Sequence, residues 1–285
     1  MGKFARSWAL AKASMEVLRA DKALLVFPLV SAIAVILVAL SFALPMFGLG
    51  LFDHISARPG GGDGMAPAFY VWAFAFYLVQ YFVIFFFTSA LVGAAMIRLD
   101  GGDPTVGDGL RIAAGKWRQI LGYAAIAATV GMLLRALEQR AGFIGRIVTG
   151  LIGVAWTLAT FLTVPVLVAR DVGPVEAVKE SAALLQRTWG ENLIGNGGLG
   201  LALGLLNLAV IGLGLLLAGG LASQGLSVLA VLVAVIAGLA VLGLALIQSA
   251  LSGIYSAALY RYAVEGNAPA GFDGALLHGA FQRKV

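Results

Sequence analysis

Two groups of acidic residues offer the first chemistry that this sequence could carry. They are Asp100, Asp103 and Asp108 in one stretch, and Asp53, His54 and Asp63 in another, which includes a histidine. Carboxylates near a lipid surface could hold Mg²⁺ for phosphoryl chemistry on a headgroup. However, segment 100–104, Asp-Gly-Gly-Asp-Pro, is also typical of a turn that begins a helix, and the similar segment 171–174 has only one acid before its proline. We therefore expect a turn here and no metal site.

Other catalytic residue types are scarce. The chain has no cysteine, which excludes disulfides and thiolate chemistry, and its only histidines are His54 and His278. It contains no Gly-rich phosphate loop of the Walker type, no Gly-x-Ser-x-Gly elbow and no His-Glu-x-x-His helix. The sequence thus predicts a protein that is not an enzyme and that binds no cofactor.

The composition indicates which elements position these residues. Hydrophobic residues make up 61% of the 285 positions and charged residues 12%, whereas a soluble domain carries about 25% charged residues. The apolar residues form long runs, and such runs cross a membrane as helices because lipid offers the backbone no hydrogen-bond partner. The predicted fold is all-α, a polytopic membrane protein with six transmembrane helices. Their predicted ranges are 23–50, 68–97, 119–137, 147–169, 193–218 and 228–260.

The third of these ranges has the shortest uncharged run. Only Ile120 through Leu134 carry no charge, so this helix needs Trp117 as an interfacial residue at one end. At the other end Arg135 must extend toward the headgroups. The alternative is a half-helix, which would invert the orientation of every later span.

Basic residues predict the orientation, because Lys and Arg in short loops stay on the cytoplasmic side of a membrane. With six spans, all but four of the 19 Lys and Arg residues fall on one side. The exceptions are Arg58, Arg135, Arg140 and Arg146. We therefore expect both termini in the cytoplasm. The net charge of +5 then follows from orientation and anionic headgroups, and no nucleic-acid partner is needed to explain it.

Polar side chains at membrane depth are the usual sign of an ion or substrate path. All 14 acidic residues fall outside the predicted span cores, which disfavours a proton- or sodium-coupled carrier. The candidate intramembrane polar path consists of Gln80, Asn207 and Gln248. Alternatively, these amides hydrogen bond between helices, as buried polar groups in membranes commonly do.

Small residues and prolines predict how the spans pack and bend. Gly200 and Gly204 form a small-xxx-small pair, which lets helix backbones approach closely. The fifth and sixth spans would then pack on each other or on another subunit. Pro28, Pro45 and Pro165 lie in or at the edges of spans and are expected to kink them.

An internal repeat links the loops to the spans. Val106, Leu110, Ala113, Trp117 and Leu121 match Val178, Ala182, Leu185, Trp189 and Leu193 at a constant offset of 72, with the spacing of one helix face. A looser third copy follows the sixth span at Pro269, Asp273-Gly274 and Leu276. The repeat predicts three units, each an amphipathic cytoplasmic helix and a two-span hairpin.

This repeat organises the chain as one membrane domain, 1–285. Amphipathic helices are predicted at 1–22, 98–118 and 170–192, hairpins at 23–97, 119–169 and 193–260, and a cytoplasmic tail at 261–285. The amphipathic helices are expected to lie among the lipid headgroups, anchored by Trp8, Trp117 and Trp189. Docking of a cytoplasmic partner is the alternative.

The amino-terminal residues carry a resemblance. The run Ser7-Trp8, Lys12-Ala13-Ser14, Val17-Leu18, Asp21-Lys22 and Leu24 through Leu29 resembles the opening of a prokaryotic family of six-pass membrane proteins of unknown function. The turn, amphipathic helix and hairpin are also similar, more remotely, to the membrane domain fused to some glycerophosphodiester phosphodiesterases. The catalytic barrel of those enzymes is missing, so no catalytic residue is implied. The resemblance implies six spans and the plasma membrane of a prokaryote.

Two functions of different classes follow from these features. The first is a non-enzymatic scaffold or accessory subunit that contacts membrane lipids and either copies of itself or another membrane protein. It is favoured by the packing glycines and the lack of catalytic groups. The second is a transporter or channel for a small or lipid-like solute, favoured by repeated hairpins and kinked spans. A lipid-modifying enzyme that uses Asp100 and Asp103 is the third hypothesis.

Overall fold

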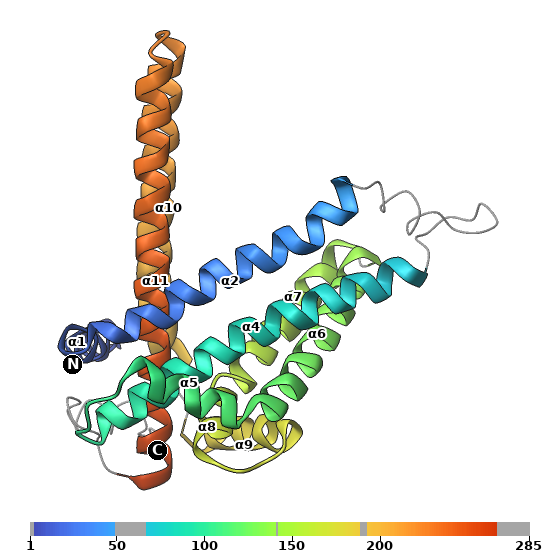
Figure 1. Cartoon of the computed structure of the whole chain (residues 1–285), viewed down its shortest axis with the longest axis vertical. Coiled ribbons are helices and arrows are strands. Elements are labelled where there is room, and N and C mark those ends of the chain that lie inside the picture. The colour runs from blue at the N-terminus through green and yellow to red at the C-terminus, as the bar shows by residue number, and fades with distance from the viewer. Residues whose placement is uncertain (1–2, 49–66, 141, 189–192, 267–285) are drawn as a thin grey trace.

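The structure is a computed structural model, and it describes residues 3–48, 67–140, 142–188 and 193–266. Figure 1 shows that these residues form helices joined by short turns. The elements are α1 (Lys3–Ala20), η1 (Lys22–Leu25), α2 (Val26–Ala43), η2 (Leu44–Gly48), α4 (Pro67–Leu99), α5 (Val106–Gly115), α6 (Trp117–Arg140), α7 (Phe143–Ala159), α8 (Thr163–Ala169), α9 (Pro174–Thr188), α10 (Leu193–Ser223) and α11 (Ser227–Glu265). No strand occurs in these ranges, so the all-α prediction is confirmed for them.

Six helical segments in the described residues are long and apolar enough to cross a membrane. They are Lys22–Phe47, Pro67–Leu99, Trp117–Gln139, Gly145–Ala169, Gly204–Ser223 and Ser227–Glu265. Each overlaps one of the six predicted ranges, and together they are compatible with a multi-pass membrane protein. The sixth predicted range was too short, because α11 runs without interruption to Glu265 and ends at Gly266, which adopts a left-handed conformation (φ 71°).

The third and fourth spans differ from the expectation in opposite ways. α6 is one helix of 24 residues, about 36 Å long at a rise of about 1.5 Å per residue, so it is not a half-helix. The fourth span is broken, because α7 ends at Ala159 and α8 begins at Thr163. The break lies one turn before Pro165, whose nitrogen cannot donate to the carbonyl of Phe161. The predicted distortion at Pro165 is confirmed.

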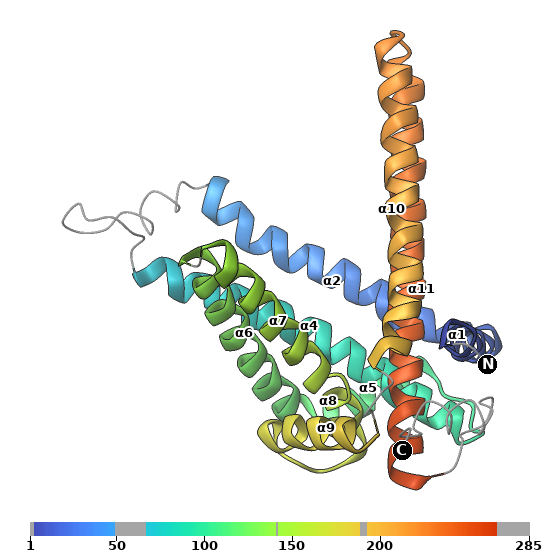
Figure 2. The same cartoon turned by 180° about the vertical axis from the view of Figure 1, so that it is seen from behind.

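Most buried side chains lie at one end of the molecule, which we call the base. The base comprises α1, α5, α8 and α9 with the adjoining ends of α4 and α11 (Figure 1). From it two groups of helices diverge, one made of α2, α4, α6 and α7 and the other of α10 and α11, as both views show (Figures 1 and 2). The second group is a long antiparallel hairpin that contacts the rest of the chain near the base of the molecule.

Close backbone approaches fix the helices at the base. A Cβ atom placed on Gly109 of α5 would lie 2.6 Å from the carbonyl oxygen of Ala90 in α4 and 2.6 Å from Cζ of Phe27 in α2. Similarly, a Cβ on Gly253 of α11 would lie 2.5 Å from Cδ2 of Leu91. Gly109 is therefore required by packing, since any larger residue would push α5 away from the α4 backbone, whereas a larger residue at 253 requires the Leu91 side chain to move.

Amphipathic helices occur near the predicted places, with different boundaries. The predicted helix 98–118 is shorter, because residue 98 still belongs to α4 and α5 begins at Val106 after a turn. α1 packs against α10 and α11, with Ala13, Val17 and Leu18 buried, so this helix is part of the core and does not only cover lipid headgroups. The third copy of the repeat lies outside the described residues, and the three-unit arrangement stays a prediction.

Candidate functional site

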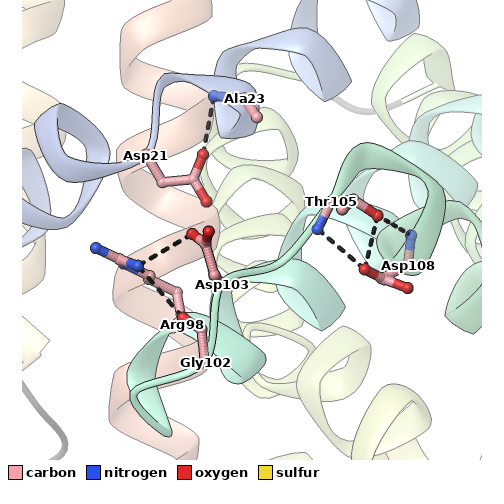
Figure 3. Close-up of polar contacts among 7 residues, drawn as sticks. All are labelled: Asp21, Ala23, Arg98, Gly102, Asp103, Thr105 and Asp108. Carbon is pink, nitrogen blue, oxygen red and sulfur yellow. Dashed lines mark hydrogen bonds and ion pairs between the residues drawn. The ribbon is translucent and has the colours of Figure 1, made fainter.

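The turn after α4 brings acidic and basic side chains together at the base. Arg98 lies 3.3 Å from Oδ1 of Asp103, its neighbour across the turn (Figure 3). Asp100 forms an ion pair with Arg261 of α11, in which Nη1 donates to Oδ2 at 2.9 Å. Arg261 also pairs with Glu265 at 2.9 Å. The turn thus joins the first group of helices to the second.

The start of α5 uses the third acid of this stretch. Figure 3 shows the Thr105 hydroxyl accepting from the Asp108 backbone nitrogen at 3.1 Å, while the Asp108 carboxylate accepts from the Thr105 backbone nitrogen at 3.0 Å. This is a capping box, which satisfies two backbone donors that a helix start leaves free. The hydrogen bonds from the side chain and backbone of Thr105, with the charge of Arg111, hold the pKa of Asp108 below its ordinary value.

The turn between α8 and α9 repeats part of this pattern. The Gly173 nitrogen donates to the Glu176 carboxylate at 3.1 Å, which is half of a capping box. Asp171 accepts from Nζ of Lys116 at 3.1 Å, so this turn is attached to the start of α6. Arg170 hydrogen bonds to Glu180, and that bond raises the pKa of the guanidinium above its ordinary value. The two turns therefore connect neighbouring hairpins at the base.

These contacts bear on the acidic group that could have held Mg²⁺. Asp100, Asp103 and Asp108 each have a separate partner, and their carboxylates are used by Arg261, Arg98 and the Thr105 cap. Within the described ranges no three His, Asp or Glu side chains come close enough to share a metal ion. Asp53, His54, Asp63 and His278 lie outside those ranges. The arrangement at the turn serves helix capping and hairpin attachment.

A side chain from α9 stabilises the break in the fourth span. The Ser181 hydroxyl donates to the Ala159 carbonyl oxygen at 2.6 Å and accepts from the Leu162 nitrogen at 3.0 Å. Ser181 is fully buried. Backbone groups that leave a helix within a membrane need such partners, because lipid supplies none. The break is therefore a fixed part of the fold.

A cleft of about 610 Å³ opens beside this break, between α4, α6 and α7. Aromatic residues and glycines dominate its lining, and all of the lining residues are uncharged. They are Tyr81, Phe85, Tyr123, Ala127, Gly131, Leu134, Gly150, Gly153, Val154, Trp156, Thr157, Leu158 and Thr160. At the end of the cleft nearer the base, the Tyr123 hydroxyl lies near the hydroxyls of Thr160 and Thr163.

A row of stacked rings runs along α4 from the end of the cleft farther from the base to the end nearer the base. The centroids of Tyr77 and Tyr81 are 6.4 Å apart, those of Tyr81 and Phe85 5.7 Å, and Phe85 stacks on Tyr123 of α6 at 4.3 Å. At the outer end the Arg135 guanidinium donates to the Tyr77 hydroxyl and lies 5.6 Å from that ring's centroid. Arg135 is thus held at the mouth of an aromatic cleft.

A family model described as "Family of unknown function (DUF6159)" matches residues 67–272, well over half of the chain. The chain belongs to this family. No curated protein and no solved structure matches it. The DUF6159 match agrees with the expected family of unknown function, whereas the remote likeness to glycerophosphodiester phosphodiesterases has no support in these comparisons. Membership in DUF6159 assigns no activity to the cleft or to the base.

The three amides of the predicted polar path lie on three different helices of this DUF6159 member. Gln80 of α4 donates to the Val35 carbonyl oxygen of α2 at 3.2 Å, so its side chain joins these two helices. Asn207 belongs to α10 and Gln248 to α11. The hydrogen bond of Gln80 fits the alternative interpretation, in which these amides bond between helices. A path through all three residues stays a prediction.

The predicted packing glycines and interfacial tryptophans of the DUF6159 chain can be placed in part. α10 and α11 do pack on each other, but their close approach is at Gly214, where a Cβ would lie 2.6 Å from the Ala237 side chain. A Cβ on Gly204 would meet nothing within 4 Å. Trp117 starts α6 and is 47% exposed, as expected of an interfacial residue. The side-chain surroundings of Gly200 and Trp8, and all of Trp189, lie outside the described residues.

The aromatic cleft was missed by sequence reasoning. A signal was present, because Tyr77, Tyr81 and Phe85 share one face of α4 at a spacing of four residues. On α7 the spacing of Gly150, Gly153, Thr157 and Thr160 also defines one small, weakly polar face. Neither face indicates a cleft by itself, since the space depends on how α4, α6 and α7 pack on one another.

Proposed function

We propose that this protein is a non-enzymatic scaffold or accessory subunit of the plasma membrane of a prokaryote. In this proposal it spans the membrane six times, keeps both termini in the cytoplasm, and assembles with copies of itself through the hairpin α10–α11. The composition, the excess of basic residues on one side and the glycine-rich hairpin support this function. The observation that carries this proposal is that the hairpin stands apart from the other spans.

The hairpin α10–α11 stands apart from the other spans. In the most apolar stretch of each of its helices only 6% of the residues are buried, against 50% in α4. Leu208, Leu215 and Leu216 of α10 are each more than 60% exposed. Lipid can cover such a surface. However, helix association in membranes depends on close backbone packing, and the hairpin offers glycines for it.

Two of these glycines lie on the outer face of α10. Gly212 and Gly219 are seven residues apart, which places them on one side of the helix, away from the contact that Gly214 makes with α11. A Cβ on either would meet nothing within 4 Å. A second copy could therefore approach the α10 backbone closely along this face.

The wedge between the two diverging groups gives a second copy further room. At its narrow end lies a cavity of about 220 Å³, lined by residues of α2, α4 and α11 that include Phe27, Phe87 and Leu246. Toward the outer ends the groups separate in both views (Figures 1 and 2). In this proposal the hairpin of a second copy lies between the separated groups.

The test is the number of copies in a lipid bilayer. Labelled protein is reconstituted at low density and photobleaching steps are counted for the wild type and for Gly212→Leu combined with Gly219→Leu. We expect two or more steps for the wild type and mainly single steps for the variant, because leucine blocks close approach. Gly115→Leu combined with Gly142→Leu is the matched control, since a Cβ on either glycine also meets nothing within 4 Å and neither lies on the hairpin. A wild type that bleaches in one step contradicts the proposal.

Transport of a small or lipid-like solute is a second candidate, favoured by the broken fourth span. Discontinuous helices often bind substrates in transporters, where free backbone groups face a cavity. Here, however, Ser181 satisfies backbone groups on both sides of the break. A solute flux in liposomes that is lost on changing Gln80, Asn207 and Gln248 to Leu would favour transport over assembly.

A further inference from the structure

The cleft between α4, α6 and α7 has the size and chemistry of a lipid-tail site. Its volume of about 610 Å³ lies within the range of about 300–1,000 Å³ for small-molecule pockets. Phe85, Tyr123 and Trp156 form much of its wall, and the lining side chains carry no charge. An ion or a strongly polar solute would lose its water there without replacement. A hydrocarbon chain would lose nothing.

Three glycines form the floor of the cleft and leave space for such a chain. A Cβ on Gly150 would meet nothing within 4 Å, and one on Gly153 would only just touch Leu134 at 4.0 Å. A Cβ on Gly131 would lie 3.4 Å from the Tyr81 hydroxyl. Side chains at the first two positions would project into the cleft, so substitution there fills it without a clash.

Two arginines mark the outer end of the cleft. Arg135 follows Gly131 by one turn of α6, and Arg146 precedes Gly150 by one turn of α7, so helix geometry places both on the faces that line the cleft. Tyr77 holds Arg135 there through its hydroxyl and its ring. Glu138 and Arg140 of α6 lie nearby in sequence, so this part of the chain has three arginines against one acid. Arginine is well suited to bind phosphate at such a position.

We propose that this cleft binds a phospholipid, with one acyl chain between α4, α6 and α7 and the phosphate against Arg135 and Arg146. The separation of charge and apolar surface matches such a lipid, with cations at the end farther from the base, rings and glycines along the lining, and threonine hydroxyls at the end nearer the base. The lipid stabilises the bundle where the fourth span is broken. This inference does not depend on the proposed assembly, because it concerns a different group of helices.

Trp156 provides a reporter inside the cleft. The chain has five tryptophans, so a variant that keeps only Trp156 is made by changing the other four to Phe. A second variant keeps only Trp72, whose ring packs on Phe42 of α2, outside the cleft, with centroids 5.8 Å apart. Each is purified in dodecyl maltoside, which carries no phosphate, and titrated with phosphatidylglycerol brominated on its acyl chains. Diacylglycerol with the same brominated chains is titrated in parallel.

We expect saturable quenching of Trp156 by phosphatidylglycerol, and about tenfold weaker apparent binding of diacylglycerol, which lacks the phosphate. Arg135→Gln combined with Arg146→Gln should remove that preference. Gly150→Leu should reduce the quenching of Trp156 with either lipid, whereas Gly238→Leu, on the exposed side of α11, should not. Unchanged quenching of Trp72 shows that the variants remain folded. Equal quenching of Trp156 by the two lipids, or arginine variants that behave as wild type, would overturn the proposal.

Discussion

Single residues at the base decide whether the helices can meet there. Gly109 lies where α5 crosses both α4 and α2, and its missing side chain allows contact with the Ala90 backbone and the Phe27 ring. Gly115 belongs to the same helix but faces open space. The two glycines therefore differ in environment while sharing a helical conformation.

Gly109→Ala should destabilise the protein and Gly115→Ala should not. The new methyl group at residue 109 would overlap a backbone carbonyl that cannot move easily, and overpacking of this kind costs about 1–3 kcal/mol. At residue 115 alanine favours the helix by up to about 1 kcal/mol. Thermal unfolding in detergent, followed by tryptophan fluorescence, should show a lower Tm for the first variant only. Equal Tm values would mean that α5 is not tightly packed on α4.

Contacts of single residues are the features that the sequence predicts least well. The small size of Gly109 is visible in the sequence, but its neighbours Ala90 and Phe27 come from other helices, and no pattern identifies such contacts. The acids at the turn were easier to interpret. Asp100-Gly101-Gly102-Asp103-Pro104 predicted a turn from local chemistry, and the turn and the capping box at Thr105 are present.

The helices follow the sequence more closely than single contacts do, because the lipid around them dictates where helices form. The six long apolar runs are helical, with the fourth divided into α7 and α8, as the lack of hydrogen-bond partners in lipid requires. The structure differs from the sequence prediction in the third and fourth spans. The short uncharged run did not shorten α6, which begins at Trp117 and continues past Arg135 to Arg140. Pro165 indicated the break in the fourth span, but its stabilisation by Ser181 of α9 depends on tertiary contact.

The break should depend on the Ser181 hydroxyl. Ser181→Ala would leave the Ala159 carbonyl and the Leu162 nitrogen buried without their partner, at a cost of about 1–3 kcal/mol. Ser256→Ala is the matched control, because that buried hydroxyl bonds only the Gly253 carbonyl of its own helix. We expect a clear fall in Tm for the first variant and little change for the second, measured in the same detergent. A similar Tm for both would show that the broken backbone finds other partners.

At the scale of the whole molecule, ion pairs between helices lie at the base. The ion pairs of Asp100 with Arg261 and of Lys116 with Asp171 lie at the base, together with α1, α5 and α9 (Figure 1). The turn between α10 and α11 is at the opposite end. If the base faces the cytoplasm, most Lys and Arg residues stay where the positive-inside rule requires them. The orientation of the base toward the cytoplasm therefore stays a prediction.

Single-cysteine labelling tests this orientation without background, because the natural chain has no cysteine. Lys12→Cys in α1 and Lys179→Cys in α9 report on the base, and Gln224→Cys reports on the turn after α10. A membrane-impermeant maleimide added to intact cells should label only residue 224, and permeabilised cells should be labelled at all three. Denatured protein serves as the control for thiol reactivity. Labelling of residues 12 and 179 from opposite sides would contradict the six-span arrangement. Labelling of both from outside would invert it, and the cleft mouth at Arg135 would then face the cytoplasm.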